Sequence, residues 1–232
     1  MKQFFDSPLL PYSPRRVTLF CGHYGSGKTN IAVNFARALH HAGKPTVIAD
    51  LDIVNPYFRT ADSEDELRAE GISVISLPFA RSNVDLPSIP SEAYSLVQDR
   101  TKYAVLDIGG DDRGAYALGR FVPYLREENN FDMLFVLNFF RPLTQNVQDA
   151  YDVFLEIEAA CGLRFTGIVN NSNLGAQTTA EDVLSTDERA RNFAEKTGLP
   201  LLFTSAEDKT AQALNGCLPG LFPMHLQARP VD

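Results

Sequence analysis

Long hydrophobic runs, basic charge and paired cysteines are scarce in this chain. Among its 232 residues, the longest mainly apolar run, at 133–140, is far shorter than a membrane span. Lys and Arg number 21 against 29 Asp and Glu, which leaves a net charge of −8. A net negative charge disfavours electrostatic binding to nucleic acid or to anionic lipid, so we expect neither nucleic acid nor a membrane as the partner.

The cysteines are Cys21, Cys161 and Cys217, which lie too far apart in sequence for a CxxC pair or a zinc-ligand cluster. Their odd number fits no disulfide framework. The stretch 1–16 is interrupted by Asp6 and by three prolines, so it lacks the hydrophobic region of a secretory signal. We therefore expect a reduced chain in the cytoplasm.

Short apolar segments with many β-branched residues alternate with longer segments of helical period. This alternation is typical of βαβ units, in which helices cover both faces of a parallel sheet. It predicts an α/β three-layer sandwich around a mostly parallel sheet of roughly seven strands. The expected strands are 16–22, 45–50, 72–77, 103–108, 131–139, 164–170 and 200–205. The expected helices are 28–41, 91–99, 115–127, 143–160, 186–197 and 209–215, with a surface loop at 78–93.

A glycine-rich phosphate loop follows the first expected strand. The segment GHYGSGKT satisfies the pattern G-x-x-x-x-G-K-[ST] and precedes the first expected helix. Glycines let successive backbone N–H groups turn toward a phosphate, Lys28 can reach the β- and γ-phosphates, and Thr29 can place its hydroxyl on Mg²⁺. A merely tight turn is the alternative, but it needs neither the lysine nor the threonine. The expected nucleotide-binding residues here are Gly22, His23, Tyr24, Gly25, Ser26, Gly27, Lys28, Thr29 and Asn30.

Carboxylates at two strand ends complete this site. Asp50 and Asp52 follow the second strand and lie on the same side of an extended chain. One can contact Mg²⁺ through water and the other can orient the attacking water; helix capping or turn formation is the alternative for each. Asp107 ends the fourth strand, and Gly110 after it offers a backbone N–H that can sense the γ-phosphate. The expected metal site comprises Thr29, Asp50, Asp52 and Asp107.

Together these motifs resemble the MinD/ParA-type (CobQ/CobB/MinD/ParA, SIMIBI class) branch of P-loop NTPases, from Arg16 to about Leu221. The resemblance implies the P-loop NTPase fold over 16–222, with an N-terminal extension at 1–15 and a C-terminal tail at 223–232. It also implies ATP or ADP and Mg²⁺ as ligands, and Lys28, Asp52 and Asp107 as catalytic residues. Asp52 falls on the position that orients water in that branch.

Base recognition is implied by the same resemblance. Asn170, followed by Asn171, lies at the strand end where the branch has an adenine-contacting asparagine, and there is no N-K-x-D. Asp208 lies in SAED, which resembles the P-E-D segment of the branch with Ala206 in place of proline. We therefore expect adenine rather than guanine, although loop asparagines are also common turn formers.

The chain departs from the branch at His23, where many members carry a lysine that reaches the phosphates of a partner subunit in a sandwich dimer. Histidine is shorter and adds little charge at pH 7. Arg59 or Arg113 can supply a substitute cation, and a solvated surface charge is the alternative for both. Gly114 occupies the position of an iron–sulfur cysteine, so no cluster is expected.

The leading hypothesis is a slow, Mg²⁺-dependent ATPase that acts as a molecular switch with an unidentified protein partner, with an ATP-sandwich homodimer as one form of it. A phosphotransferase or ligase acting on a small acid, of the dethiobiotin-synthetase kind, is the second hypothesis. The third is a nucleotide-binding module without hydrolysis.

Overall fold

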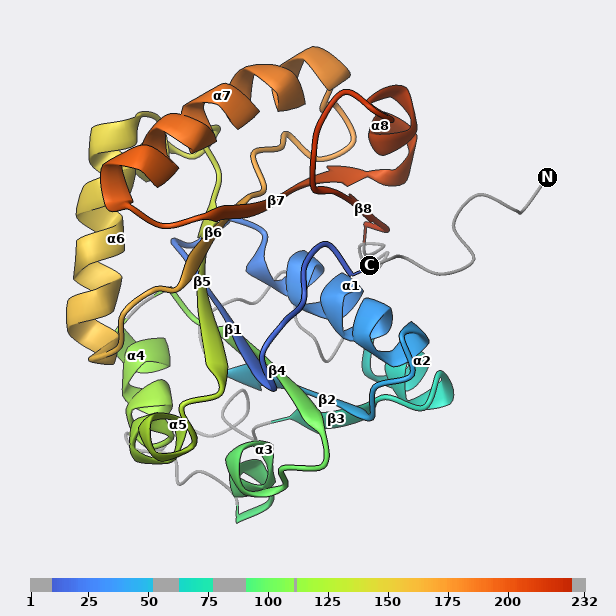
Figure 1. Cartoon of the computed structure of the whole chain (residues 1–232), viewed down its shortest axis with the longest axis vertical. Helices are drawn as coiled ribbons and strands as arrows, with labels where there is room; N and C mark the ends of the chain where they lie inside the picture. Colours follow the sequence, from blue (N-terminus) through green and yellow to red (C-terminus); the bar gives the residue numbers. More distant parts are fainter. Residues whose placement is uncertain (1–9, 52–62, 77–90, 111, 227–232) are drawn as a thin grey trace, which may run out of the picture.

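The computed structural model describes residues 10–51, 63–76, 91–110 and 112–226. Within these ranges the chain forms one eight-stranded sheet of order β3-β2-β4-β1-β5-β6-β7-β8, in which every pairing is parallel (Figure 1). The strands are β1 (Val17–Cys21), β2 (Thr46–Leu51), β3 (Ser73–Ser76), β4 (Tyr103–Ile108), β5 (Phe131–Leu137), β6 (Gly167–Asn170), β7 (Leu201–Glu207) and β8 (Leu221–Met224). The predicted α/β class and parallel sheet are confirmed.

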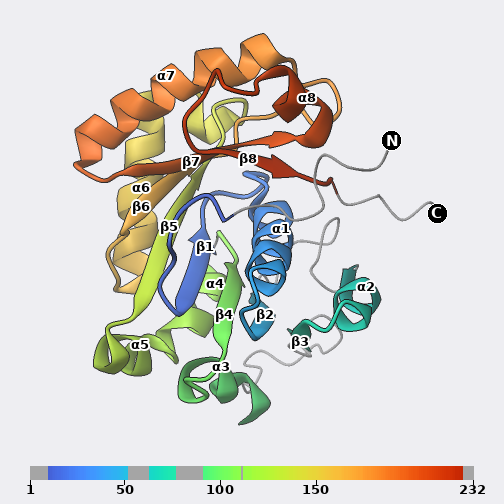
Figure 2. The same ribbon diagram turned by 45° about the vertical axis from the view of Figure 1, so that its right-hand side comes forward.

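Helices cover both faces of the sheet. Successive residues of β1 point to opposite layers, because Leu19 packs in one apolar cluster and Phe20 in the other. Helices α1 and α2 lie on one side of the sheet, while α4, α5 and α6 lie on the other (Figures 1 and 2). The helices are α1 (Lys28–His41), α2 (Glu64–Ala69), η3 (Ser91–Tyr94), α3 (Ser95–Gln98), α4 (Asp112–Gly119), α5 (Val122–Glu128), η4 (Pro142–Thr144), α6 (Val147–Cys161), α7 (Ala180–Thr197) and α8 (Asp208–Ala213).

Helix α7 begins at Ala180 rather than at 186 as predicted. Thr179 and Asp182 form a reciprocal capping box, in which Thr179 N donates to Asp182 Oδ2 at 2.9 Å and Asp182 N donates to Thr179 Oγ1 at 3.2 Å. These bonds hold the pKa of the Asp182 carboxyl below its usual value. The first turn is therefore stabilised by its cap and not by an apolar stripe.

Two elements were not predicted, and one predicted helix is divided. The predicted helix 115–127 forms α4 and α5, and Pro123 lies in the first turn of α5. Helix α2 and strand β8 were missed; β8 contains Pro223, which has no N–H and is typical of an edge strand. Strand β8 extends to Met224, past the predicted domain end at 222. No helix in the described ranges is long and apolar enough to span a bilayer.

Candidate nucleotide-binding site

The phosphate loop connects β1 to α1 at the carboxyl edge of the sheet. Gly25 and Gly27 adopt φ values of 75° and 87°, a backbone region that favours glycine. A Cβ atom on Gly22 would lie 2.5 Å from Val136 O, and one on Gly27 would collide with Asn171 Nδ2. The glycines are thus required by the tight packing of the loop on β5 and on the segment after β6.

Thr29 and Asp107 meet directly. Thr29, in the first turn of α1, donates from Oγ1 to Asp107 Oδ2 at 2.6 Å, and Asp107 is 0% exposed at the end of β4. Asp50 is the register partner of Asp107 across β2 and β4, so the two carboxylates lie on the same face of the sheet. The structure therefore brings together three of the four predicted metal-site residues, and Asp52 lies outside the described residues.

The donor set fits Mg²⁺. This ion prefers oxygen ligands and, in phosphate sites, takes only one or two protein ligands together with waters and phosphate oxygens. The Thr29 hydroxyl, held by the Asp107 carboxylate, is such a ligand. Among the described residues no group of three or more His, Cys, Asp or Glu side chains is placed to hold a metal ion.

Gly110 lies against the phosphate loop. A Cβ atom at Gly110 would collide with Gly22 O and would lie 3.1 Å from Tyr24 N. The backbone after β4 therefore touches the loop that is expected to hold the phosphates. Helix α4 begins at Asp112, two positions after Gly110.

Asn171 supports the phosphate loop from beneath. Its Nδ2 donates to Ser26 O at 2.7 Å, and its Oδ1 accepts from Ser205 Oγ at 2.7 Å. Asn170 Oδ1 accepts from Ser172 Oγ at 2.7 Å. Asn170 and Asn171 are 0% and 1% exposed, and Asn170 Nδ2 has no hydrogen-bond partner among the described residues. The pair lies beneath the phosphate loop, and the base contact expected of it stays a prediction.

Replacing Asn171 by alanine is expected to lower the free energy of unfolding by about 1–3 kcal/mol, because Ser26 O and Ser205 Oγ lose a buried partner. Nucleotide affinity should fall roughly tenfold, since the loop loses its support. Urea unfolding and titration with a fluorescent ATP analogue measure the two effects. Asn215→Ala, at an exposed position near β8, is the control and should change neither; equal behaviour of both variants would contradict the assignment.

Asp208 lies at the start of α8 and is joined to α1 through the end of β8. His225 Nδ1 is 3.3 Å from Asp208 Oδ2, and His225 N donates to Asn34 Oδ1 at 2.9 Å. Asn34 Nδ2 in turn donates to Asn30 O at 2.8 Å. The predicted residues Asn30 and Asp208 are thus linked by two residues, Asn34 and His225, that the sequence did not indicate.

One cationic residue at the loop, Arg141, was not among those predicted. His23 Nδ1 lies 3.1 Å from Tyr24 O, so the imidazole is engaged by its own loop. Arg141, which the sequence did not indicate, donates from Nε to Gly25 O at 2.7 Å. The predicted substitutes Arg59 and the Arg113 side chain lie outside the described part of the structure. The sandwich dimer that the resemblance implies stays a prediction.

The thiol closest in sequence to the loop is not a nucleophile. Cys21, the last residue of β1, is 1% exposed. Burial is the main cause that raises the pKa of its thiol well above the usual value, so it stays protonated.

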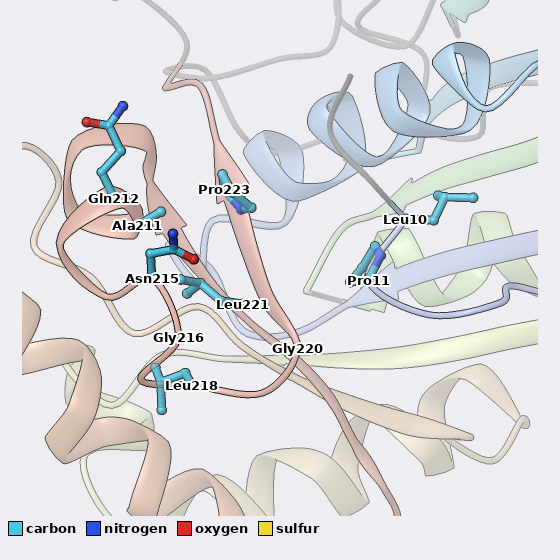
Figure 3. Close-up of a pocket in the computed structure, with 10 residues that line it drawn as sticks. All are labelled: Leu10, Pro11, Ala211, Gln212, Asn215, Gly216, Leu218, Gly220, Leu221 and Pro223. Carbon is cyan, nitrogen blue, oxygen red and sulfur yellow. The ribbon is translucent and has the colours of Figure 1, made fainter. Parts of the chain in front are cut away.

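A groove of about 730 Å³ lies beside strand β8 (Figure 3). None of the predicted site residues lines it. Its walls come from α8, from β8 and its preceding turn, and from the segment before β1: Leu10, Pro11, Ala211, Gln212, Asn215, Gly216, Leu218, Gly220, Leu221 and Pro223. It is therefore separate from the candidate site.

Comparison with models of known families and with curated proteins found no match. Solved structures do match. The cell division protein FtsY from Thermotoga maritima is 20% identical, with a TM-score of 0.56 over 87% of this chain and 65% of that chain. FtsY from Mycoplasma mycoides, in its H32 crystals, is 15% identical, with a TM-score of 0.54 over 84% of this chain and 62% of that chain. A second crystal form gives 16% identity and a TM-score of 0.51, over 83% and 62% of the two chains.

This chain thus spans less than two thirds of the length of the FtsY chains it matches, at 62–65%. At these identities the likeness concerns the fold. In this chain the parallel sheet carries the glycine loop before α1, and the Thr29–Asp107 contact joins the start of α1 to strand β4. The chain has the P-loop NTPase fold that FtsY also has.

Proposed function

We propose that this chain is a Mg²⁺-dependent ATP-binding protein that hydrolyses ATP slowly and works as a nucleotide-dependent switch. The contact between Thr29 and Asp107 carries the proposal, because it joins the phosphate loop to a buried carboxylate at the end of β4. The fold shared with FtsY supports a place in the SIMIBI class of P-loop NTPases.

Each part of the site has a role in phosphoryl transfer, which needs mainly positioning and neutralisation of charge. Backbone N–H groups of the loop and the start of α1 hold the phosphates, and Lys28, 4% exposed, adds a positive charge there. Thr29 holds the metal, and Asp107 orients the Thr29 hydroxyl. A bound Mg²⁺ would be held by the Thr29 hydroxyl and would offset the negative charge of the phosphates.

The contact of Gly110 with the loop supports the switch. Since Gly110 packs on Gly22 and Tyr24, any shift of the loop on binding a γ-phosphate displaces the backbone that leads into α4. The proposal also includes Asp52 as the residue that orients the attacking water. This role stays a prediction from the sequence.

Wild-type protein is expected to bind Mg²⁺–ATP at least about tenfold more tightly than Mg²⁺–GTP, a difference of about 1.4 kcal/mol, because the segment NNSN lacks the N-K-x-D pattern of guanine recognition. Isothermal titration calorimetry with each nucleotide measures the preference for ATP over GTP. Repeating it with a chelator measures the dependence of binding on Mg²⁺. Chelation should weaken ATP binding, and Asp107→Asn should reduce that dependence on Mg²⁺.

Two results would contradict the proposal. Equal or tighter binding of GTP would remove the adenine assignment, and binding that a chelator leaves unchanged would remove the metal. Hydrolysis is assayed on the protein alone. If turnover appears only after a small acid is added, the ligase alternative replaces the switch.

A further inference from the structure

Arg141 is a cationic residue in direct contact with the phosphate loop. It follows β5, and β5 pairs with β1 in a register that places Cys21 opposite Phe135. Because carboxyl ends of neighbouring parallel strands lie at the same edge of a sheet, the loops after β1 and β5 meet there. The hydrogen bond from Arg141 Nε to Gly25 O, 2.7 Å long, is the direct contact between them.

The backbone at Arg141 is held by a buried network. Asn138, 0% exposed, accepts at Oδ1 from Phe140 N at 3.0 Å. Its carbonyl accepts from Arg141 N at 3.2 Å and from Thr144 Oγ1 at 2.5 Å. Thr144 N closes the turn by donating to Arg141 O at 3.0 Å. This network fixes the point from which the arginine extends.

The guanidinium packs against Gly25. A Cβ atom at Gly25 would lie 3.4 Å from Arg141 Nε and 3.8 Å from Arg141 Cζ, so the missing side chain leaves room for close approach. The Nε–H group is used by Gly25 O. Within the described ranges the terminal N–H groups have no hydrogen bond to the protein, and such groups can bind phosphate in a bidentate way.

Arg141 differs in its charge partners from the ion-paired arginines of this acidic chain. Arg16, Arg37 and Arg191 each form an ion pair with a carboxylate. Among the residues that the structure describes, no carboxylate pairs with Arg141. An arginine that touches a phosphate loop without a protein counter-ion is suited to an anionic ligand.

We propose that Arg141 supplies, within the same chain, the positive charge for the terminal phosphate that His23 does not supply. This inference rests on the proposed function. In hydrolysis a bond forms between the water oxygen and the γ-phosphorus, the bond to the β–γ bridging oxygen breaks, and the water protons pass to phosphate and solvent. Arg141 balances the charge that develops on the phosphate oxygens during this step.

The test compares Arg141→Ala and Arg141→Gln with wild type. Glutamine keeps an N–H donor for Gly25 O but has no charge. Both variants should bind ADP within about threefold of wild type, bind a non-hydrolysable ATP analogue at least tenfold more weakly, and lose roughly 10²–10³-fold in kcat. Calorimetry measures the two affinities, phosphate-release kinetics measure kcat, and the melting temperature verifies that the variants are folded.

Arg126→Ala is the matched control. Arg126 donates from Nη2 to Gly162 O at 2.6 Å, a similar guanidinium-to-carbonyl contact between α5 and the end of α6. This variant should match wild type in every assay. If the Arg141 variants lose ADP and ATP-analogue affinity equally, or if Arg141→Gln matches wild type, Arg141 only supports the loop and the inference is overturned. If the wild-type protein binds neither ADP nor the ATP analogue, the proposed function itself is overturned, and the inference about Arg141 falls with it.

Discussion

Replacement of Lys28 by alanine is expected to remove measurable ATP binding while the fold persists. Lys28 is the first residue of α1 and is 4% exposed, so its ammonium group is held at the loop rather than in solvent. Hydrogen bonds to charged groups contribute about 1.5–3 kcal/mol each. Loss of contacts to two phosphates therefore weakens binding by roughly 10²–10⁴-fold.

Calorimetry with Mg²⁺–ATP measures this loss, and circular dichroism verifies that the variant is folded. Lys28→Met retains the buried aliphatic stem without the charge, so it separates the electrostatic effect from a packing defect. Lys44→Ala serves as a control, because the Lys44 ammonium lies 5.0 Å from the Tyr103 ring and away from the loop. Tight ATP binding by the alanine and methionine variants would disprove the role assigned to the loop.

Much of the sheet could be predicted because a central parallel strand buries both of its faces. Residues of β1 and β4 are nearly all buried, which gives the continuous apolar runs that the prediction used. Strand β8 lacks such a run, since Pro223 interrupts it at the edge of the sheet. The first turn of α7 was missed because its signal is the polar cap of Thr179 and Asp182, not an apolar stripe.

The residues of the candidate site also fall into two groups: those that the sequence indicates and those that only the fold brings to the site. Lys28, Thr29 and Asp107 lie in short motifs whose chemistry can be recognised along the chain. Arg141 and the supporting contact of Asn171 come from loops after β5 and β6. They reach the phosphate loop because the sheet order places β5 beside β1 and β6 next to β5. Strand order is a tertiary property, so neither contact was visible in the spacing of residues.

A stability prediction of comparable size concerns Arg16, at the start of β1. Its guanidinium is 6% exposed and forms an ion pair with Glu128, whose side chain is 9% exposed. The Nη1 group also donates to Leu96 O and Lys102 O, each at 3.1 Å, and to Asp99 O at 3.3 Å. One side chain thus joins β1 to α5 and to the segment between α3 and β4.

Replacing Arg16 by alanine should lower the free energy of unfolding by about 3–5 kcal/mol, because Glu128 keeps a buried charge without its partner. Since a domain is stable by only about 5–15 kcal/mol, this loss is a large part of the total. Urea unfolding followed by circular dichroism measures it. Arg15→Ala is the neighbouring control: Arg15 is 50% exposed, its ion pair with Asp132 spans 3.7 Å, and its removal should cost at most about 1 kcal/mol.

The double variant Arg16→Met with Glu128→Leu separates two explanations of that loss. If the cost arises from a carboxylate left alone in the interior, removing both charges should make the double variant more stable than Arg16→Ala. If the cost arises from the four backbone carbonyls that Arg16 satisfies, those of Leu96, Val97, Asp99 and Lys102, the double variant should be no more stable than the single one, because both lack those donors. We expect partial recovery, since removing both charges leaves no lone carboxylate, while the buried carbonyls of Leu96 and Val97 still lack their donor.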